Sequence, residues 1–438
     1  MATSTKTVAI PYGTSSLPLH IPVGCRVLSG KAARPTVSVA RSVQRALAAP
    51  IGCGPLEDII RRRGARRAVV ALSDMTRPVP YPHFLPLLLA RIEQAGIARN
   101  RITLVIAAGM HRPMTRSEQE GCYGRETVRN YRIVNHTAAN PRSVVDTGKE
   151  MPSGARLFVN RHFVEADIRI VTGLIEPHFM AGFSGGRKAV VPGLVNLDAI
   201  QKFHGYRMLN HARAANGVVG GNPVHREALG GARAVGVDFA VNVTITHDRR
   251  LSGIFAGELD ASWRAGVEAV RKQVMVSVGR TFDLVVTSGG GAPLDRTFYQ
   301  TVKGMVAVLP LLHRGSRLLI ASGCAAGIGS REYRELLFRY RGDYRSFIRD
   351  CKSADRVLRD QWEYQMQCKV LQKVGVEGIR LLSDGIPLAQ QRLMSLLPCE
   401  FGRAGPAEGL QRAFDELSAG VSPRSIAIVP QGPYLVLR

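Results

Sequence analysis

The chain contains few cysteines, few acidic residues and no long apolar run, and these shortages exclude several classes of protein. The 7 cysteines are scattered and include no C-x-x-C pair, which argues against a disulfide framework and against a zinc site made of thiolates. No apolar run reaches the roughly 18 residues that a membrane span needs, so we expect no membrane partner. The start, MATSTKTVAIPYG, lacks the basic and apolar blocks of a secretory signal, and we predict a cytoplasmic protein.

The shortage of acidic residues leaves a large positive charge. The chain has 34 aspartates and glutamates against 59 lysines and arginines, a formal charge of +25. The excess is mostly arginine and is spread along the chain, with one dense cluster at RRRGARR, residues 61–67. Aromatic residues are not interleaved with the basic ones. We therefore predict small anionic partners and no nucleic-acid partner, although arginines gathered on one face would favour a nucleic-acid binder.

The length and the pattern of apolar runs predict two α/β domains. A chain of 438 residues is two to three times a typical domain. Short apolar runs such as RRAVVALSD, RITLVIAAG, ADIRIVTG and FDLVVTSGGG alternate with helical patterns, which is typical of mainly parallel sheets flanked by helices. We place the N-terminal domain at 1–275 and the C-terminal α/β domain at 276–438. The last strand, within 424–438, could pack on either domain.

Polar clusters follow four of the predicted strands. They read SDMTRP (residues 73–78), AGMHRPMT, LIEPHFMAGFSGGRK and GGGAPLDRTFYQTVK. Ligands of open α/β sheets bind beyond the carboxyl ends of the strands, where the strand-to-helix loops converge. We therefore expect these clusters to form an active site, which we place in the cleft between the two domains.

The turn AGFSGGRK offers glycines and a lysine together. Backbone N–H groups around Gly185 and Gly186 could form a concavity for a phosphate, although a tight connection needs glycines just as well. The turn is not a Walker A loop, since Ala189 stands where that motif has a hydroxyl. Lys188, taken alone, would ordinarily be a surface lysine.

Three histidines are candidates for chemistry. His111 and His178 follow strand ends and are flanked by prolines that stiffen the loops, so each could be an acid/base group or only a hydrogen-bonded loop residue. His204 lies in a predicted helix, LDAIQKFHGYRM, and could be structural. No H-x-x-x-H pattern or histidine–carboxylate cluster is present nearby, so a metal site made by protein ligands alone has little support.

Two further clusters are suited to a carboxylate ligand. Arg77, which follows Asp74 and Thr76, could bind a carboxylate with two N–H groups or could pair with an acidic neighbour. Tyr299 and Lys303, with Gln300, lie on one side of a predicted helix that follows three glycines. The start of that helix would also attract an anion.

The clusters, in this order, resemble the lactate racemase family that uses a nickel-pincer nucleotide. The matching segments are SDMTRP, AAGMHRPMT, EPHFMAGFSGGRKAVVPG, KFH and GGGAPLDRTFYQTVK, which extend from residue 73 to 303. VAIPYG near the start and IVPQGPY near the end also resemble the family's termini. Each segment is short, but five in register make a specific signal.

The resemblance implies a role for each matching residue. The cofactor is nickel held by pyridinium-3,5-bisthiocarboxylic acid mononucleotide, which would be attached to Lys188 through a thioamide. His204 would be the protein ligand of nickel, the other donors coming from the cofactor. The catalytic acid/base residues would be His111 and His178. The cofactor-binding residues would be Asp74, Met75, Thr76, Arg77, Gly185, Gly186 and Lys188, and the substrate-binding residues Arg77, Tyr299, Gln300 and Lys303.

The resemblance also implies a reaction. The C2 hydrogen of a 2-hydroxy acid would leave as hydride while a histidine takes the hydroxyl proton, and the resulting 2-keto acid could be reduced on its other face. We therefore predict a racemase or epimerase of a 2-hydroxy acid, supplied with its cofactor by separate biosynthesis proteins. The alternatives are a C2 epimerase of a sugar acid and a nucleotide-binding homologue without catalysis.

Overall fold

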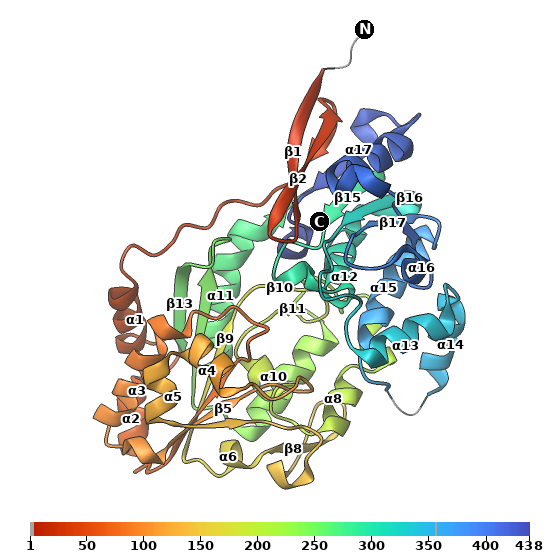
Figure 1. Cartoon of the computed structure of the whole chain (residues 1–438). Helices are drawn as coiled ribbons and strands as arrows, with labels where there is room; N and C mark the ends of the chain where they lie inside the picture. The colour runs from red at the N-terminus through yellow and green to blue at the C-terminus, as the bar shows by residue number, and fades with distance from the viewer. Residues whose placement is uncertain (1–3, 355–356) are drawn as a thin grey trace. The chain divides into compact units, whose positions relative to one another are not determined.

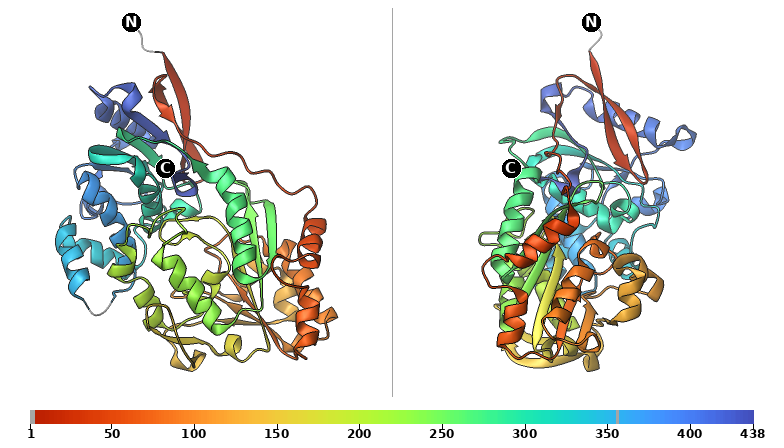
Figure 2. Two further views of the ribbon diagram at one scale, coloured as in Figure 1. Left: turned by 180° about the vertical axis from the view of Figure 1, so that it is seen from behind. Right: turned by 90° about the vertical axis from the view of Figure 1, so that its left-hand side faces the viewer.

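The structure is a computed structural model that describes residues 4–354 and 357–438. The chain divides into two compact units. The central unit comprises residues 31–203 and 213–273, and the terminal unit comprises residues 1–30, 204–212 and 274–438. Figure 1 colours the chain by residue number and Figure 2 gives two further views. No described helix is long and apolar enough to cross a membrane.

The central unit contains a six-stranded sheet in the order β13-β12-β9-β4-β5-β6. Its neighbouring strands are parallel except for the β12–β13 hairpin, which is antiparallel. The strands of this unit are β4 (Ala68–Leu72), β5 (Ile102–Ile106), β6 (Arg132–Asn135), β7 (Val144–Glu150), β8 (Arg156–Asn160), β9 (Ile168–Leu174), β10 (Pro177–His178), β11 (Gly182–Phe183), β12 (Phe239–Ile245) and β13 (Leu251–Gly257). Its helices are α1 (Val39–Ala48), α2 (Leu56–Arg62), α3 (Leu85–Gln94), α4 (Arg116–Tyr123), α5 (Arg125–Asn130), α6 (Arg161–Val164), α7 (Arg187–Val190), α8 (Leu197–Phe203), α10 (Pro223–Val235) and α11 (Leu259–Val274).

The core of the central unit follows the two-residue alternation of its strands. Val70 and Leu72 of β4, with Leu104 of β5, pack on one face in one cluster with Leu47 of α1 and Leu88 of α3. Helices α1 and α3 contact each other and are labelled side by side in Figure 1. On the other face, α7 contacts β9 and β4. Because both faces are covered, all five residues of β4 are buried, as the continuous apolar run in the sequence predicts.

The terminal unit contains a second six-stranded sheet, in the order β18-β17-β16-β15-β19-β3, with all neighbours parallel. Its strands are β1 (Thr5–Tyr12), β2 (Ser15–Pro22), β3 (Arg26–Val27), β14 (Met275–Val276), β15 (Phe282–Ser288), β16 (Leu312–Ala321), β17 (Ile379–Leu382), β18 (Leu397–Pro398), β19 (Ile426–Val429) and β20 (Val436–Leu437). Its helices are α9 (Tyr206–Leu209), α12 (Phe298–Ala307), α13 (Arg331–Tyr340), α14 (Tyr344–Ser353), α15 (Gln361–Val374), α16 (Leu388–Gln391) and α17 (Gly405–Ser418). The predicted fold class, α/β with mainly parallel sheets flanked by helices, is therefore confirmed for both units.

The second sheet is also covered on both faces. The β1–β2 hairpin and α17 pack on one face, where Leu284, Leu319 and Ile428 meet Leu19 and Phe414. Helices α12 and α15 pack against each other, against β16 and, for α12, against β15. The first segment of the sequence is thus tied to the last, because β3 pairs with β19.

The two units differ from the predicted domain ranges. The predicted boundary near residue 275 lies close to the junction of the units at 273 and 274, but residues 1–30 and 204–212 group with the terminal unit. The last strand, left open by the sequence, pairs inside the terminal unit, where β19 lies beside β15 and β20 beside β14. These assignments depend on long-range strand pairs that local patterns do not encode.

One predicted helix is interrupted. The sequence predicted a helix at LDAIQKFHGYRM, but α8 ends at Phe203 and α9 begins at Tyr206, so His204 lies between helices. Gly205, a poor helix former, lies at the interruption.

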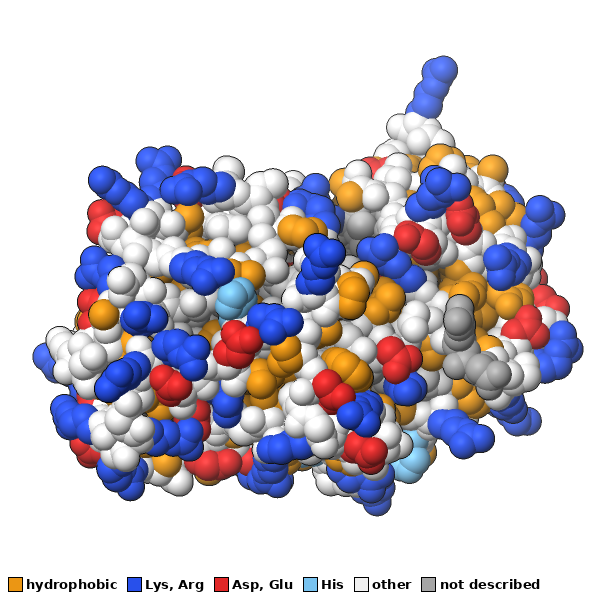
Figure 3. Space-filling model, turned by 90° about the horizontal axis from the view of Figure 1, so that it is seen from below, with side chains coloured by type: hydrophobic (Ala, Val, Ile, Leu, Met, Phe, Trp, Pro, Cys, Tyr) orange, Lys and Arg blue, Asp and Glu red, His pale blue; other side chains and the backbone are white. Residues whose placement is uncertain are grey.

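The basic side chains are dispersed on the face drawn in Figure 3, where they lie among acidic and uncharged ones. Within the arginine cluster at residues 61–67, Arg61 pairs with Asp58, and Arg63 pairs with Asp238. This distribution favours a solvated surface over a nucleic-acid interface on that face.

Candidate active site

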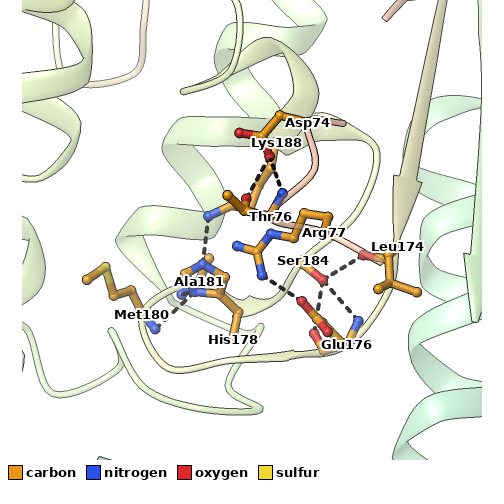
Figure 4. A network of polar contacts seen from close by, with 10 residues as sticks. All are labelled: Asp74, Thr76, Arg77, Leu174, Glu176, His178, Met180, Ala181, Ser184 and Lys188. Atoms are coloured by element: carbon orange, nitrogen blue, oxygen red, sulfur yellow. Dashed lines mark hydrogen bonds and ion pairs between the residues drawn. The ribbon is translucent and has the colours of Figure 1, made fainter. Parts of the chain in front are cut away.

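The polar residues after β4 and β9 form a network in the central unit (Figure 4). β4 lies between β9 and β5, and Ala71 is in register with Val171 on one side and with Val105 on the other. The loops that follow these three parallel strands therefore leave the sheet at the same edge. They carry Asp74 and Arg77, His111, and the segment from Glu176 to Lys188.

His111 is paired with Asp74. His111 Nδ1 lies 2.5 Å from Asp74 Oδ2, and Thr76 donates its hydroxyl to Asp74 Oδ1 at 2.6 Å. Burial alone would raise the pKa of Asp74, but the hydrogen bonds and charge of His111, with the bond from Thr76 and the charge of Arg77, hold it below its usual value. Asp74 is therefore ionised at neutral pH.

This pair fixes the orientation of the His111 ring. An ionised carboxylate can only accept hydrogen bonds, so Nδ1 carries a hydrogen and Nε2 of neutral His111 has the free lone pair. The His111 side chain is 55% exposed, whereas that of Asp74 is 6% exposed. A buried carboxylate thus presents an accessible imidazole with Nε2 as its reactive nitrogen.

Asp74→Asn is expected to lower kcat for the 2-hydroxy acid that the sequence predicts as substrate about 10- to 100-fold with little change in KM, because an amide can also donate and no longer selects one tautomer. Steady-state rates of both variant and parent would measure the effect. Asp146→Asn is the matched control, since Asp146 pairs with Arg156 at 2.6 Å on the separate β7–β8 hairpin. Equal kcat in the Asp74 variant and the parent would contradict a role for this pair.

His178 is held through its other nitrogen. The backbone N–H groups of Met180 and Ala181 both donate to His178 Nδ1, each at 3.2 Å. His178 Nε2 lies 2.9 Å from Lys188 Nζ, and the side chain of His178 is buried. Because Nδ1 accepts two hydrogen bonds, neutral His178 carries its hydrogen on Nε2, which is the opposite tautomer to that of neutral His111.

The glycine turn that carries Lys188 is closely packed. Gly185 has a φ of +102°, and a Cβ there would lie 2.9 Å from Ile175 and 3.0 Å from Trp263. A Cβ at Gly186 would lie 3.1 Å from Asn242 Oδ1, which also accepts the Gly186 N–H at 2.8 Å. Close packing therefore accounts for glycine at both positions, and their contact with a phosphate stays a prediction.

Arg187 ties this turn together, although no local sequence pattern predicted this role. Its guanidinium donates to the carbonyls of Ala181, Phe183 and Ser184 and to His225 Nδ1. It also lies 3.8 Å from the centroid of the Trp263 ring, and only 1% of the residue is exposed. Burial lowers the pKa of Arg187 to about 9, which leaves the guanidinium charged at neutral pH.

Arg77 contacts a carboxylate of the protein itself. Arg77 Nη1 lies 2.6 Å from Glu176 Oε1, as drawn in Figure 4. The sequence left open whether Arg77 binds a ligand or pairs with a neighbour, and this structure contains the pair. Neighbouring Met75 is 47% exposed, and its sulfur accepts a weak contact from Arg112 at 4.0 Å.

The remaining predicted residues lie in the terminal unit. Trp362 Nε1 donates to Tyr299 Oη at 2.7 Å, and the rings of Trp362 and His204 stack with centroids 4.5 Å apart. Trp362 thus joins two predicted site residues, although no motif marks it. Gln300 and Lys303 lie on α12, whose N-cap Thr297 accepts from the N–H of Gln300.

The described residues contain no group of three or more His, Cys, Asp or Glu side chains arranged to hold a metal ion. The polar groups gathered in the central unit are two oriented imidazoles, an amine and a guanidinium–carboxylate pair. Such a set suits proton transfer on a small carboxylate, so the fold and the site define an α/β protein with the groups of an acid/base enzyme.

Comparison with known proteins identifies the family. Residues 12–217 match the lactate racemase N-terminal domain, and residues 278–393 match the lactate racemase C-terminal domain. The chain is 35% identical over 370 residues to a lactate racemase of Thermoanaerobacterium thermosaccharolyticum, covering 83% of this chain and 85% of that protein. A lactate racemase of Lactiplantibacillus plantarum is 33% identical over 337 residues, covering 76% and 78% of the two chains. The chain belongs to the lactate racemase family.

The fold comparison agrees. The solved structure of the lactate racemase apoprotein from T. thermosaccharolyticum matches with a TM-score of 0.89 and 31% identity, covering 99% of this chain and 100% of that chain. A Thermotoga maritima protein matches with a TM-score of 0.66 and 18% identity, covering 93% of this chain and all of its own, which shows a shared fold only.

Proposed function

We propose that this protein is an isomerase that interconverts the enantiomers of a 2-hydroxy acid, with lactate the first substrate to test. Its relatives named lactate racemase support the reaction. The observation that carries the proposal is that protein groups orient both His111 and His178 through Nδ1. Nδ1 of His111 faces a carboxylate, so Nε2 of neutral His111 holds the lone pair. Nδ1 of His178 accepts two N–H groups, so Nε2 of neutral His178 carries the hydrogen, beside Lys188 Nζ. The pair therefore offers one proton acceptor and one proton donor.

The residues fit the nickel-pincer nucleotide that the family resemblance implies. Lys188 supplies a primary amine, the group that a thioamide link requires, from a turn whose packing admits no side chain at Gly185. His204 supplies an imidazole, a donor that suits nickel. When bound, the cofactor would accept the C2 hydrogen of the substrate as hydride and return it. Asp74, Met75, Thr76, Gly185 and Gly186 remain proposed cofactor contacts.

The chain's own residues would handle the proton and the carboxylate. One histidine takes the hydroxyl proton of one enantiomer at Nε2, and the other returns a proton to the carbonyl oxygen of the resulting 2-keto acid when the opposite enantiomer forms. Assistance of this kind typically contributes about 10² to 10⁴ in rate. Arg77 would bind the substrate carboxylate, with Tyr299, Gln300 and Lys303 as further substrate contacts. We also propose that the protein is cytoplasmic and that separate biosynthesis proteins supply its cofactor.

The tether can be tested by mass. Protein made together with the cofactor pathway is expected to carry about one nickel and a covalent mass increment, both lost in Lys188→Ala, because no other residue is proposed to hold the cofactor covalently. Intact-mass and metal analysis would measure both. Lys272→Ala, which changes an exposed lysine on α11, should keep both. An unchanged mass in the parent protein would rule out the tether.

The reaction itself needs a separate assay. Single-enantiomer 2-hydroxy acids, including lactate, malate, aryl-substituted acids and sugar acids, should be incubated with the loaded protein and analysed by chiral chromatography. If the protein interconverts only sugar acids, the proposed function becomes C2 epimerisation of a sugar acid instead of racemisation of a short 2-hydroxy acid. A loaded protein that interconverts none of them would contradict the proposed function.

A further inference from the structure

The Arg77–Glu176 ion pair has a consequence for how a substrate can bind. Arg77 follows β4 and Glu176 follows the neighbouring strand β9, 99 residues later. Their side chains are 29% and 22% exposed, so both are accessible to a small solute. The ion pair therefore links two loops that are far apart in the sequence but leave the sheet at the same edge.

Glu176 is the fixed member of the pair. Its N–H donates to Ser184 Oγ at 3.0 Å, and its carbonyl accepts from the N–H of Ser184 at 2.9 Å. Ser184 in turn donates its hydroxyl to the carbonyl of Leu174 at 2.6 Å, as Figure 4 shows. The backbone of Glu176 is thus bound to the glycine turn and to the end of β9, while Arg77 reaches it through a long, flexible side chain.

The contact selects one edge of the guanidinium. Arginine can bind a carboxylate with two parallel N–H groups along either the Nη1–Nη2 edge or the Nε–Nη2 edge. Glu176 takes Nη1 at 2.6 Å, and the side chain of Arg77 makes no other hydrogen bond to the described residues. The Nε–Nη2 edge is therefore the one that remains for a second carboxylate.

We propose that Glu176 is a positioning residue that holds Arg77 so that its Nε–Nη2 edge binds the substrate carboxylate. The inference rests on the proposed function, since it concerns the same substrate. Glu176 does not touch the substrate in this proposal and acts only through Arg77. It also neutralises Arg77 when no substrate is bound, which opposes the capture of other anions.

A double-mutant cycle tests whether Glu176 acts through Arg77. Glu176→Ala is expected to lower kcat/KM for the accepted 2-hydroxy acid about tenfold or more, mainly through KM, because Arg77 loses its fixed orientation. In an Arg77→Ala background, the same change should have less than about a twofold effect. Glu176→Gln, whose amide oxygen can still accept from Nη1, should recover most of the parent rate. Equal effects of Glu176→Ala in both backgrounds would overturn the proposal.

A chemical probe tests the pair without relying on turnover. Phenylglyoxal modifies arginine side chains, and peptide mass would report its rate at Arg77 in the apoprotein. We expect Glu176→Ala to raise that rate about fivefold or more, because the carboxylate no longer restrains the guanidinium. Glu165→Ala, which breaks the exposed Arg161–Glu165 pair, should leave it unchanged. Equal rates in Glu176→Ala and the parent would overturn the inference, whereas a loaded parent without turnover would overturn only the proposed function.

Discussion

His111→Ala and His178→Ala are each expected to abolish net interconversion of enantiomers, with losses of about 10²- to 10⁴-fold or more. Each imidazole presents Nε2 as its reactive nitrogen, and alanine leaves no group to replace it. The two variants should nevertheless keep the covalent mass increment and the nickel, because neither histidine is the proposed tether or metal ligand. Chiral chromatography, intact mass and metal content of the same preparation would test these expectations together.

The two variants should differ in which enantiomer they still attack. If one histidine serves each enantiomer, each variant should form a trace of bound 2-keto acid, detectable after an acid quench, from only one of the two. The preferred enantiomer should be opposite in His111→Ala and His178→Ala. His83→Ala, which changes an exposed histidine, should behave as the parent. Parent-like racemisation by either variant would remove that histidine from the proposal.

Arg187→Met is expected to destabilise the central unit by about 3 kcal/mol or more, because the buried carbonyls and the His225 nitrogen that the guanidinium satisfies would lose their donor. Removing a buried charge would by itself stabilise the protein, but methionine cannot donate the hydrogen bonds that the guanidinium made. Chemical unfolding followed by the fluorescence of Trp263, which lies against Arg187, would measure the change. Replacing Trp362 by phenylalanine leaves Trp263 as the only tryptophan, since the chain has 2.

The matched comparison is Arg187→Lys, which keeps the charge but has one donor group and no planar face for the Trp263 ring. We expect its free energy of unfolding to lie between that of the parent and that of Arg187→Met. An Arg187→Met protein as stable as the parent would contradict a structural role for these hydrogen bonds. The same experiment would then show that the Ala181–Ser184 segment keeps its shape without them.

Local patterns predicted much of this fold because buried parallel strands leave a continuous apolar run. The runs containing Ala68–Leu72, Ile102–Ile106 and Ile168–Leu174 are strands, and polar residues follow each of them. The sequence also predicted that Lys188 and His178 belong to one loop cluster, and their side chains are 2.9 Å apart. These features depend on neighbours within a few residues, which is the range over which sequence patterns are informative.

Features that depend on distant segments could not be read in the same way. The pairing of Arg77 with Glu176 joins residues 99 positions apart, and the stacking of Trp263 on Arg187 joins residues from a helix and a turn. No periodicity marks such partners. His204 illustrates a different error, since the sequence predicted one helix through LDAIQKFHGYRM while the helix is interrupted between Phe203 and Tyr206. Gly205 lies at the interruption, and its low helix propensity was the local signal that this prediction did not use.

The order in which the chain is synthesised gives the discontinuous terminal unit a consequence. The last segment of the central unit ends at residue 273, so all of its strands have been synthesised while more than a third of the 438 residues are still untranslated. The sheet of the terminal unit cannot be completed so early, because β3, near the start of the chain, pairs with β19, near its end. Its N-terminal edge must therefore wait for nearly the whole polypeptide to emerge, and folding during translation should proceed from the middle of the sequence outward.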